Sequence, residues 1–309
     1  MFHTMKAAVC PKYGPPEVLQ VCEVPKPVAE NNEMLVKVMA TAVNSGDVRV
    51  RGLAAKGVMK FFMRLAVGFS KPREPILGSA YAGIVESVGA NVTGYQIGDK
   101  VFGMTGFAFG THAEYVKVTA NSVVLSMPAE ASYEEAASLL FGGQTAIYFL
   151  LKANIRKGFS KVLIIGSSGS VGTAAIQIAS CYGASITVVC SSAGKPLMES
   201  LGVLSIILYD QEDFTKRTDQ YDIVFDAVGK TTRKQCAKLL KEGGVYKTVG
   251  GMEYASENVE QLKIIKSLFE IGAYKAVIDK TYTLEDIVEA HKYVETGRKK
   301  GNVVLKIRA

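Results

Sequence analysis

The spacing of apolar residues divides the chain into two regions with different periodicities. In the first 125 or so residues, short β-like segments are separated by glycine and proline turns, which is typical of a small antiparallel barrel. These segments are 6–9, 34–40, 83–89 and 113–118. From Ser132 onward, buried-strand patterns alternate with helical spacing, which predicts a doubly wound parallel sheet with helices between its strands.

The strands predicted for this sheet are 162–165, 185–190, 205–209, 221–226 and 244–249. A last segment, 303–307, alternates again and is expected to return to the first region. We therefore predict an α/β protein of two domains. The first is a barrel domain of residues 1–125 and 270–309, and the second is an inserted doubly wound domain of residues 126–269.

The composition is that of a globular protein with two cores, with 48% hydrophobic and 21% charged residues in 309. No apolar run approaches the roughly 18 residues that span a bilayer, and no cleavable leader pattern opens the chain, so we expect a cytoplasmic protein without a membrane segment. The net charge of +7 is spread along the sequence, with one tight basic cluster at 298–300. Nucleic-acid binding is therefore not expected.

Cysteine and histidine spacing gives no sign of a metal or disulfide framework. The five cysteines form no C-x-x-C pair and are odd in number, and the three histidines lie far apart without an H-E-x-x-H arrangement. We predict no metal ligands, and no side chain stands out as a catalytic acid or base.

A glycine-rich turn follows the apolar run 162–165 and leads into a helical pattern. Gly166 suits a tight turn at the strand end, Gly169 allows a pyrophosphate to approach the backbone, and Gly172 allows close packing of helix on strand. Free N–H groups at the start of such a helix bind anions. Taken alone, this G-x-x-G-x-x-G spacing is equally typical of an ordinary βα turn.

The end of the next predicted strand indicates which dinucleotide such a loop would hold. An acidic residue there would bind the ribose 2′-hydroxyl of NAD, but the chain reads Cys190-Ser191-Ser192-Ala193-Gly194-Lys195. Two hydroxyls and an ammonium can bind a 2′-phosphate, which a carboxylate would repel. We therefore predict NADPH as the cofactor; the alternative is a solvated turn with an incidental lysine.

Several further motifs, together with the 166–172 loop, resemble the zinc-free quinone oxidoreductase branch of the medium-chain dehydrogenase/reductase superfamily, the zeta-crystallin-like proteins. The resemblance covers nearly the whole chain. The motifs are Met5-Lys-Ala-Ala-Val, Tyr13-Gly-Pro-Pro-Glu-Val-Leu, Val43-Asn44-Ser-Gly-Asp47-Val, Ala82-Gly-Ile-Val-Glu-Ser-Val-Gly89, Gly98-Asp-Lys-Val-Phe-Gly103, Ala113-Glu-Tyr115, Gln144-Thr145-Ala146 and Glu289-Ala-His-Lys-Tyr-Val-Glu-Thr-Gly297.

The resemblance implies a GroES-like catalytic domain, an inserted Rossmann domain and an active site in the cleft between them. It also implies roles for individual residues in holding the cofactor. The pyrophosphate loop would be Gly166, Ser168, Gly169, Val171 and Gly172; the 2′-phosphate pocket Ser191, Ser192, Lys195 and Tyr209; and the nicotinamide side Asn44, Thr145, Val228, Gly229 and Gly250. Tyr209 could equally be an ordinary strand-end aromatic residue, and Asn44 a backbone cap.

The reaction that the resemblance implies is hydride transfer from NADPH to quinones or to the carbon–carbon double bond of enals and enones. The zinc ligands of related alcohol dehydrogenases would fall at Asn44, Ser79 and Phe141, none of which is a plausible zinc ligand. Reduction of an electron-poor acceptor does not need a Lewis acid. The alternatives are a non-catalytic NADPH-binding protein that uses its basic surface on RNA or another partner, and a zinc-type alcohol dehydrogenase.

Three features bear on the substrate and on assembly. Gly78-Ser79-Ala80-Tyr81-Ala82-Gly83 lacks the family's acidic residue and introduces Tyr81, which alters either the pocket lining or the turn. We expect Asn44, Phe62 and Tyr81 to line a pocket for a hydrophobic electrophile. Segment 56–70 has Met59, Phe62, Met63 and Ala66 at helical spacing, and would form either a mobile wall over the substrate or a helix packed on the barrel. The family's sixth strand is missing after 249–251, which predicts a monomer or a dimer through another surface.

Overall fold

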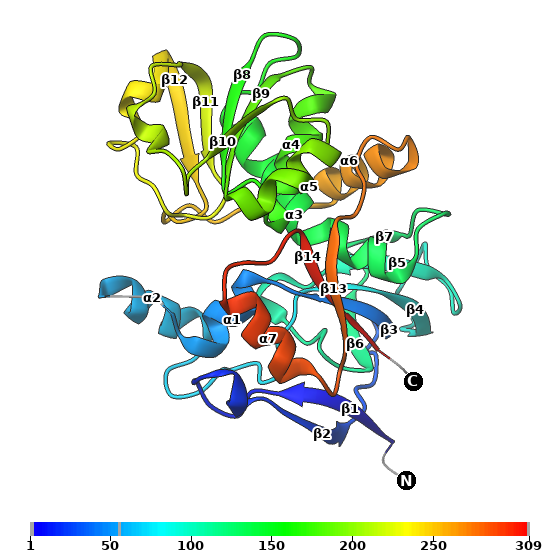
Figure 1. Ribbon diagram of the computed structural model, residues 1–309. Coiled ribbons are helices and arrows are strands. Elements are labelled where there is room, and N and C mark those ends of the chain that lie inside the picture. The colour runs from blue at the N-terminus through cyan, green and yellow to red at the C-terminus, as the bar shows by residue number, and fades with distance from the viewer. Residues whose placement is uncertain (1–2, 55–56, 308–309) are drawn as a thin grey trace. The chain divides into compact units, whose positions relative to one another are not determined.

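The computed structural model describes residues 3–54 and 57–307, which form two compact units (Figure 1). One unit comprises Met1–Leu140 with Ile278–Ala309, and the other comprises Phe141–Val277. The divide therefore falls later than the predicted boundaries after 125 and 269. At the first boundary the reason is that helix α3 (Tyr133–Lys152) runs unbroken from one unit into the other, so the change of pattern near Ser132 marks the start of a helix.

The first unit is built on an antiparallel sheet in the order β13-β14-β3-β4-β5-β7, with β6 paired to β3. Its strands are β3 (Glu33–Val43), β4 (Ala80–Val88), β5 (Lys100–Met104), β6 (Tyr115–Thr119), β7 (Val123–Ser126), β13 (Ile278–Thr283) and β14 (Asn302–Lys306). A separate antiparallel pair is formed by β1 (Thr4–Val9) and β2 (Gln20–Pro25). β14 pairs antiparallel with β3, which confirms that the end of the chain returns to this unit, while β13 and β14 run parallel.

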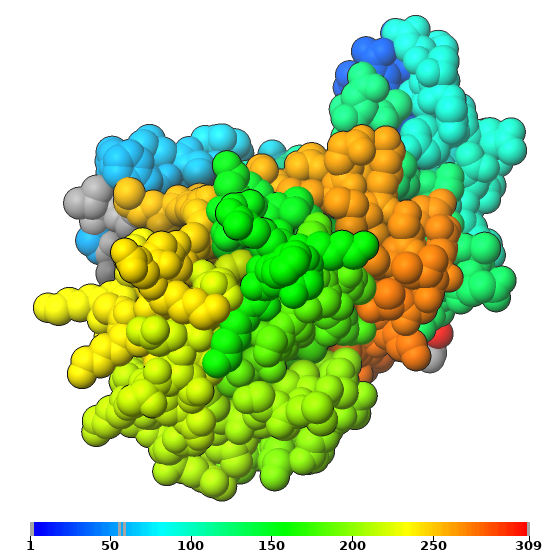
Figure 2. Space-filling model, turned by 90° about the horizontal axis from the view of Figure 1, so that it is seen from above, coloured from blue at the N-terminus to red at the C-terminus, as the bar shows by residue number. Residues whose placement is uncertain are grey.

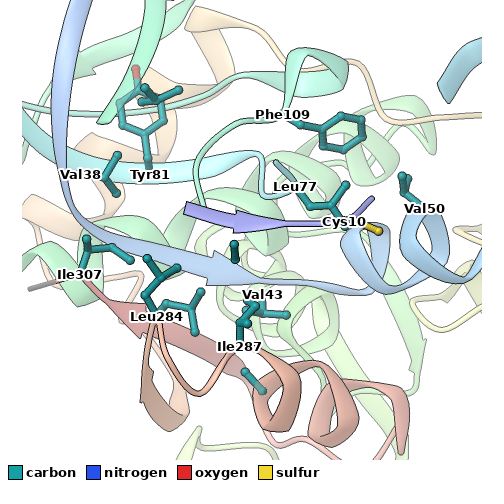
Figure 3. Packing of buried hydrophobic residues seen from close by; sticks show 14 of the residues in the cluster. Cys10, Val38, Val43, Val50, Leu77, Tyr81, Phe109, Leu284, Ile287 and Ile307 are labelled. Atoms are coloured by element: carbon teal, nitrogen blue, oxygen red, sulfur yellow. The ribbon is translucent and has the colours of Figure 1, made fainter. Parts of the chain in front are cut away.

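Helices α1 (Ser45–Gly52), α2 (Val58–Val67) and α7 (Ile287–Glu295) and the short 3₁₀ turns η1 (Pro16–Val18) and η2 (Gly106–Ala108) complete this unit. Its hydrophobic core includes Tyr81, whose side chain is fully buried with Val38 and Leu77 in the same cluster (Figure 3). The prediction that Tyr81 lines a substrate pocket is therefore wrong. Tyr81 lies on β4, where strand alternation turns its ring into the core.

The second unit contains a five-stranded parallel sheet in the order β10-β9-β8-β11-β12 (Figure 1). The strands are β8 (Lys161–Ile165), β9 (Ser185–Cys190), β10 (Ser205–Leu208), β11 (Tyr221–Asp226) and β12 (Leu240–Thr248), which confirms the five predicted ones. Parallel strands are covered on both faces and so read as continuous apolar runs; Val162, Leu163 and Ile164 are fully buried. The strand order reverses between β8 and β11, where such sheets bind ligands.

The connections are less helical than predicted. α4 (Ser170–Cys181) joins β8 to β9, and η3 (Ser192–Gly194) with α5 (Lys195–Ser200) joins β9 to β10. In the described residues 209–220 and 227–239, the connections before β11 and β12 are rich in polar residues and contain the 3₁₀ turns η4 (Phe214–Lys216) and η5 (Ala237–Leu239) instead of α-helices. α6 (Val259–Glu270) follows β12, so in the described chain β12 is an edge of the sheet. The oligomeric state stays a prediction.

The segment predicted as either a mobile wall over the substrate or a helix packed on the barrel contains helix α2. Phe62 and Ala66 are exposed, whereas Met63 packs against the core of the first unit. Phe61 makes edge-to-face contacts with Phe62 and Phe69. Lys56 and the side chain of Met59 lie outside the described residues. No helix in the described ranges has both the length and the apolar character needed to cross a membrane.

A buried polar cluster lies beneath α7. The rings of His112 and His291 meet edge to face with centroids 5.8 Å apart. The Arg51 guanidinium is also buried and pairs with Glu295 at 2.8 Å. Burial lowers the pKa of His112 to about 4, although a contact with the Ala42 carbonyl acts in the opposite direction. Burial, and after it the neighbouring His112, lower the pKa of His291 as well, so both imidazoles are neutral at physiological pH.

This burial predicts an acid-sensitive fold, and His112→Gln tests it. Between pH 6.5 and about 4 the unfolded chain binds a proton at His112 that the folded chain does not bind. On acidification the wild type should therefore lose free energy of unfolding relative to the variant, by about 1.4 kcal/mol per pH unit. Urea unfolding followed by circular dichroism at neutral pH and at about pH 5 measures this difference. Parallel pH curves for the two proteins would contradict it.

Candidate functional site

The glycine-rich loop after β8 is held by close contacts that leave no room for a side chain at two of its positions. Gly166 has φ +73°, and a Cβ there would collide with the Val228 side chain. A Cβ on Gly172 would lie 2.5 Å from the Gly166 carbonyl oxygen. Gly169 differs, because a Cβ there would meet only the same oxygen at 3.9 Å. Because Gly166 and Gly172 have no side chains, the first turn of α4 packs closely against the loop that follows β8.

The start of α4 has the features of an anion site. Its N-cap is Gly169, which provides no side-chain oxygen to the first N–H groups of the helix. These groups have no partner within an α-helix and carry the positive end of its dipole. α3 packs closely here, because a Cβ on Gly142 would collide with the Ser170 backbone. Thr145 lies almost one helical turn further along α3 and is buried.

The turn after β9 lies against this loop. A Cβ on Gly194 would sit 3.2 Å from the Ser168 Cβ, so the fold brings together two sites that the sequence predicts separately. Lys195 opens α5, and its Nζ lies 3.7 Å from the Glu199 carboxylate in a half-exposed pair. Tyr209 follows β10 and is exposed, and its N–H donates to the Cys190 carbonyl at 3.0 Å. The individual roles predicted for these residues stay predictions.

This corner also contains a carboxylate that the sequence reasoning missed. The Ser192 N–H lies 3.0 Å from both carboxylate oxygens of Asp210, and the Ser192 hydroxyl donates to Oδ1 at 3.0 Å. The Ser192 N–H and hydroxyl lower the pKa of Asp210, so it is ionised at neutral pH. The expectation of a corner without a carboxylate is wrong. The signal that could have revealed this carboxylate is the register of β9 and β10. Because Leu208 pairs with Cys190, Asp210, two residues after Leu208, lies beside Ser192, two residues after Cys190.

A second missed residue, Asp226, organises the loop after β11. Its buried carboxylate accepts the N–H groups of Val228 at 3.1 Å, Gly229 at 2.8 Å and Thr231 at 2.7 Å. A Cβ on Gly229 would lie 2.6 Å from the Gly250 Cα, so the loops after β11 and β12 touch. The available signal was an acidic residue that ends a buried strand and precedes Ala-Val-Gly.

In the first unit, Asn44 caps helix α1. Its Oδ1 accepts the N–H groups of Gly46 and Asp47, and the Asp47 carboxylate accepts the Asn44 N–H, which completes a capping box. The alternative that Asn44 is a backbone cap is therefore confirmed. Its Nδ2 is also buried and has no hydrogen-bond partner within the described residues, so both of its N–H groups are unpaired.

Asp47 joins this cap to the segment before β4. Its Oδ1 accepts the Gly78 N–H at 3.2 Å. Burial raises the pKa of Asp47 to about 7, although its two backbone hydrogen bonds act in the opposite direction. Asp47 thus positions Asn44 and the segment leading to Ser79. Its burial and hydrogen bonds mark it as a positioning residue rather than a solvent-accessible acid.

The side chains in the zinc-ligand register are an amide, a hydroxyl and a phenyl ring, at Asn44, Ser79 and Phe141. Within residues 3–54 and 57–307, no three His, Cys, Asp or Glu side chains are grouped to hold a metal ion. A cavity of about 150 Å³ in the first unit is lined by residues that include Val50, Val67 and Phe109 but not Phe62. A hollow of about 250 Å³ in the second unit adjoins Asp222 and Val245, away from the glycine loop.

α6 covers the same side of the second unit as α4. Gln144 of α3 donates to the Asn258 carbonyl at 3.2 Å, and a Cβ on Gly143 would lie 2.8 Å from Ile265 of α6. Gln177 of α4 donates to the Lys275 carbonyl at 3.1 Å. The surface view shows α6 in orange against the green residues that include α3 and α4 (Figure 2). The helices that support the glycine loop are thus tied together.

Two family models match the chain, one to each part of this architecture. The alcohol dehydrogenase GroES-like domain matches residues 30–129, and the zinc-binding dehydrogenase domain matches residues 170–282. The 2-methylene-furan-3-one reductase of Solanum lycopersicum is 33% identical over 97% of this chain and 79% of its own length. The chloroplastic NADPH-dependent alkenal/one oxidoreductase of Arabidopsis thaliana is 30% identical over the same shares.

A solved structure is also similar to this chain over its whole length. The quinone oxidoreductase from Coxiella burnetii superposes with a TM-score of 0.87 at 29% identity, covering 99% of this chain and all of that one. The chain belongs to the medium-chain dehydrogenase/reductase superfamily and, within it, to the zinc-free quinone oxidoreductase branch. The GroES-like and Rossmann folds that the sequence predicts are confirmed.

A pair of glycine variants tests the backbone contacts of the loop. Gly172→Ala should destabilise the second unit by at least about 2 kcal/mol, because backbone atoms must move to admit the methyl group. Gly169→Ala is the matched control and should lose less than about 1 kcal/mol, the cost of alanine at an N-cap, since its Cβ fits without displacement. Thermal unfolding of both variants measures this. Equal stability of Gly172→Ala and Gly169→Ala would contradict the packing described here.

Proposed function

We propose that this protein is a zinc-independent oxidoreductase that transfers hydride from NADPH to quinones or to the carbon–carbon double bond of enals and enones. The observation that carries the proposal is the meeting of four loops at the carboxyl ends of β8, β9, β11 and β12, with an uncapped helix start among them. The names of the relatives support the choice of reaction. NADPH is our choice of cofactor because Ser191 and Lys195 offer polar groups to a 2′-phosphate, whereas the Ser192 donors bond the Asp210 carboxylate.

The residues fit a dinucleotide in physical terms. The α4 N-terminus suits a pyrophosphate, and the open space at Gly169 allows it to approach the backbone. In the proposed site, Val228, Gly229 and Gly250 would border the cofactor along its length, and Thr145 would contact its nicotinamide side. The buried Nδ2 of Asn44 would donate to a ribose hydroxyl or to the acceptor.

NADPH supplies the hydride when it is bound. The protein's part is to hold the two reactants in line and to exclude water, and orientation of this kind supplies roughly 7–11 kcal/mol. A conjugated acceptor is already electron-poor, so the amide, hydroxyl and phenyl side chains at Asn44, Ser79 and Phe141 suffice where zinc ligands would otherwise stand. We propose that solvent provides the proton that completes reduction of the acceptor.

Turnover tests this function directly. Purified protein should oxidise NADPH in the presence of at least one acceptor from a panel of quinones, enals and enones, followed by the loss of NADPH absorbance. Added zinc should not be required, and simple alcohols should not reduce NADP⁺. Binding of NADPH without oxidation by any acceptor would favour the alternative of a non-catalytic NADPH-binding protein. Activity only after zinc loading would favour a zinc-type alcohol dehydrogenase.

Variants of Asn44 separate its two roles. Asn44→Ser keeps an oxygen that caps α1, so stability should stay within about 0.5 kcal/mol, whereas kcat/KM should fall about tenfold because the Nδ2 donor is lost. Asn44→Ala loses both the cap and the donor, and should in addition be destabilised by about 1 kcal/mol. Steady-state kinetics and thermal unfolding of the two variants measure this. Full activity in Asn44→Ser would show that Asn44 serves only as a cap.

A further inference from the structure

The corner predicted to bind the 2′-phosphate already holds an anion, the side chain of Asp210. The carboxylate accepts both the N–H and the hydroxyl of Ser192, each at 3.0 Å. Gln211 donates to the same hydroxyl through Nε2 at 3.1 Å. Thus the Ser192 donors that would hold a phosphate are held by Asp210, and the Ser192 hydroxyl is also the acceptor for Gln211.

The position of Asp210 follows from the sheet. β9 and β10 are parallel neighbours, with Leu208 in register with Cys190. The Tyr209 N–H continues the pairing to the Cys190 carbonyl, and Asp210 follows directly. The backbone therefore places Asp210 beside Ser192. The Lys195 ammonium lies 3.7 Å from the Glu199 carboxylate.

We propose that Asp210 is a specificity-determining residue that restricts the preference for NADPH and lets the same site accept NADH; this inference rests on the proposed function. A 2′-phosphate must displace the carboxylate from Ser192 and bear its repulsion. A ribose 2′-hydroxyl can instead donate to the carboxylate, as acidic residues do in NAD sites. In this proposal the Lys195 ammonium favours the 2′-phosphate of NADPH, whereas the Asp210 carboxylate opposes it. The ratio of the NADH and NADPH dissociation constants reflects the balance of these two effects.

Asp210→Asn tests this role with little change in shape. The asparagine oxygen still accepts the Ser192 N–H, so the turn keeps its conformation, while the negative charge is gone. The dissociation constant for NADPH, measured by titration calorimetry at low ionic strength, should fall roughly three- to tenfold. The dissociation constant for NADH should stay the same or rise slightly, because its 2′-hydroxyl loses a charged acceptor. Raising the salt concentration should reduce the difference between wild type and variant.

Asp213→Asn is the matched control. It removes the same charge from the same connection, but Asp213 bonds Thr215 rather than Ser192. This control should leave the ratio of NADH to NADPH dissociation constants unchanged. A ratio that is the same in Asp210→Asn as in the wild type, or that shifts equally in Asp213→Asn, would overturn the proposal.

The measurement does not depend on turnover. If the expected shift appears but no acceptor is reduced, the role of Asp210 stands and the proposed reaction fails. If acceptors are reduced but the ratio does not move, the role of Asp210 fails and the reaction stands. If neither dinucleotide binds to the wild type, both proposals are overturned.

Discussion

The contact of Gly172 with the backbone at Gly166 is the constraint on which the candidate site depends. With no Cβ at either position, the first turn of α4 lies against the end of β8, and the positive φ of Gly166 turns the chain between them. Val228 then fills the space beside Gly166, which fixes the loop after β11 next to the loop after β8. Because these contacts are between backbone atoms or with a β-branched side chain, they leave little freedom for the loops to separate.

Hydrogen bonds, rather than apolar packing, then shape the neighbouring loops. Asp226 gathers three backbone N–H groups in the loop after β11, and Asp210 holds Ser192 in the turn after β9. In the first unit Asp47 similarly ties Asn44 to Gly78. The Nδ2 of Asn44 is one of several buried polar atoms without a hydrogen-bond partner in the described residues, and leaving it unpaired costs stability unless a ligand uses it. Each carboxylate thus fixes a loop that bears a candidate binding residue.

The sequence predicts the secondary structure best where one physical requirement dominates. The five parallel strands are found because burial on both faces demands continuous apolar runs, and the return of the last strand is found by its alternation. More helix is predicted before β11 and β12 than the structure shows, because the polar connections described there form the 3₁₀ turns η4 and η5. The first domain boundary is placed too early because α3 belongs to both units, so a change of pattern does not mark that boundary.

The sequence is a weaker guide to the direction in which a side chain points and to which residues of neighbouring strands lie side by side. Tyr81 stands within a motif next to Ser79, but strand alternation turns its ring into the core. Asp210 lies 18 residues from Ser192 in the chain, and only the register of β9 and β10 brings them together. Asp226 is visible in the sequence as a strand-ending acid, but its three N–H partners become apparent only when the loop is folded.

The loops described here form a binding site only if a dinucleotide contacts the start of α4. Hydrogen exchange with and without NADPH tests this most directly, because a pyrophosphate that accepts the first N–H groups of α4 must slow their exchange. Peptides that contain residues 166–173 should be protected by NADPH, together with those that contain 226–231. Saturating NADPH that leaves exchange in residues 166–173 unchanged would contradict the assignment of this loop as the phosphate site.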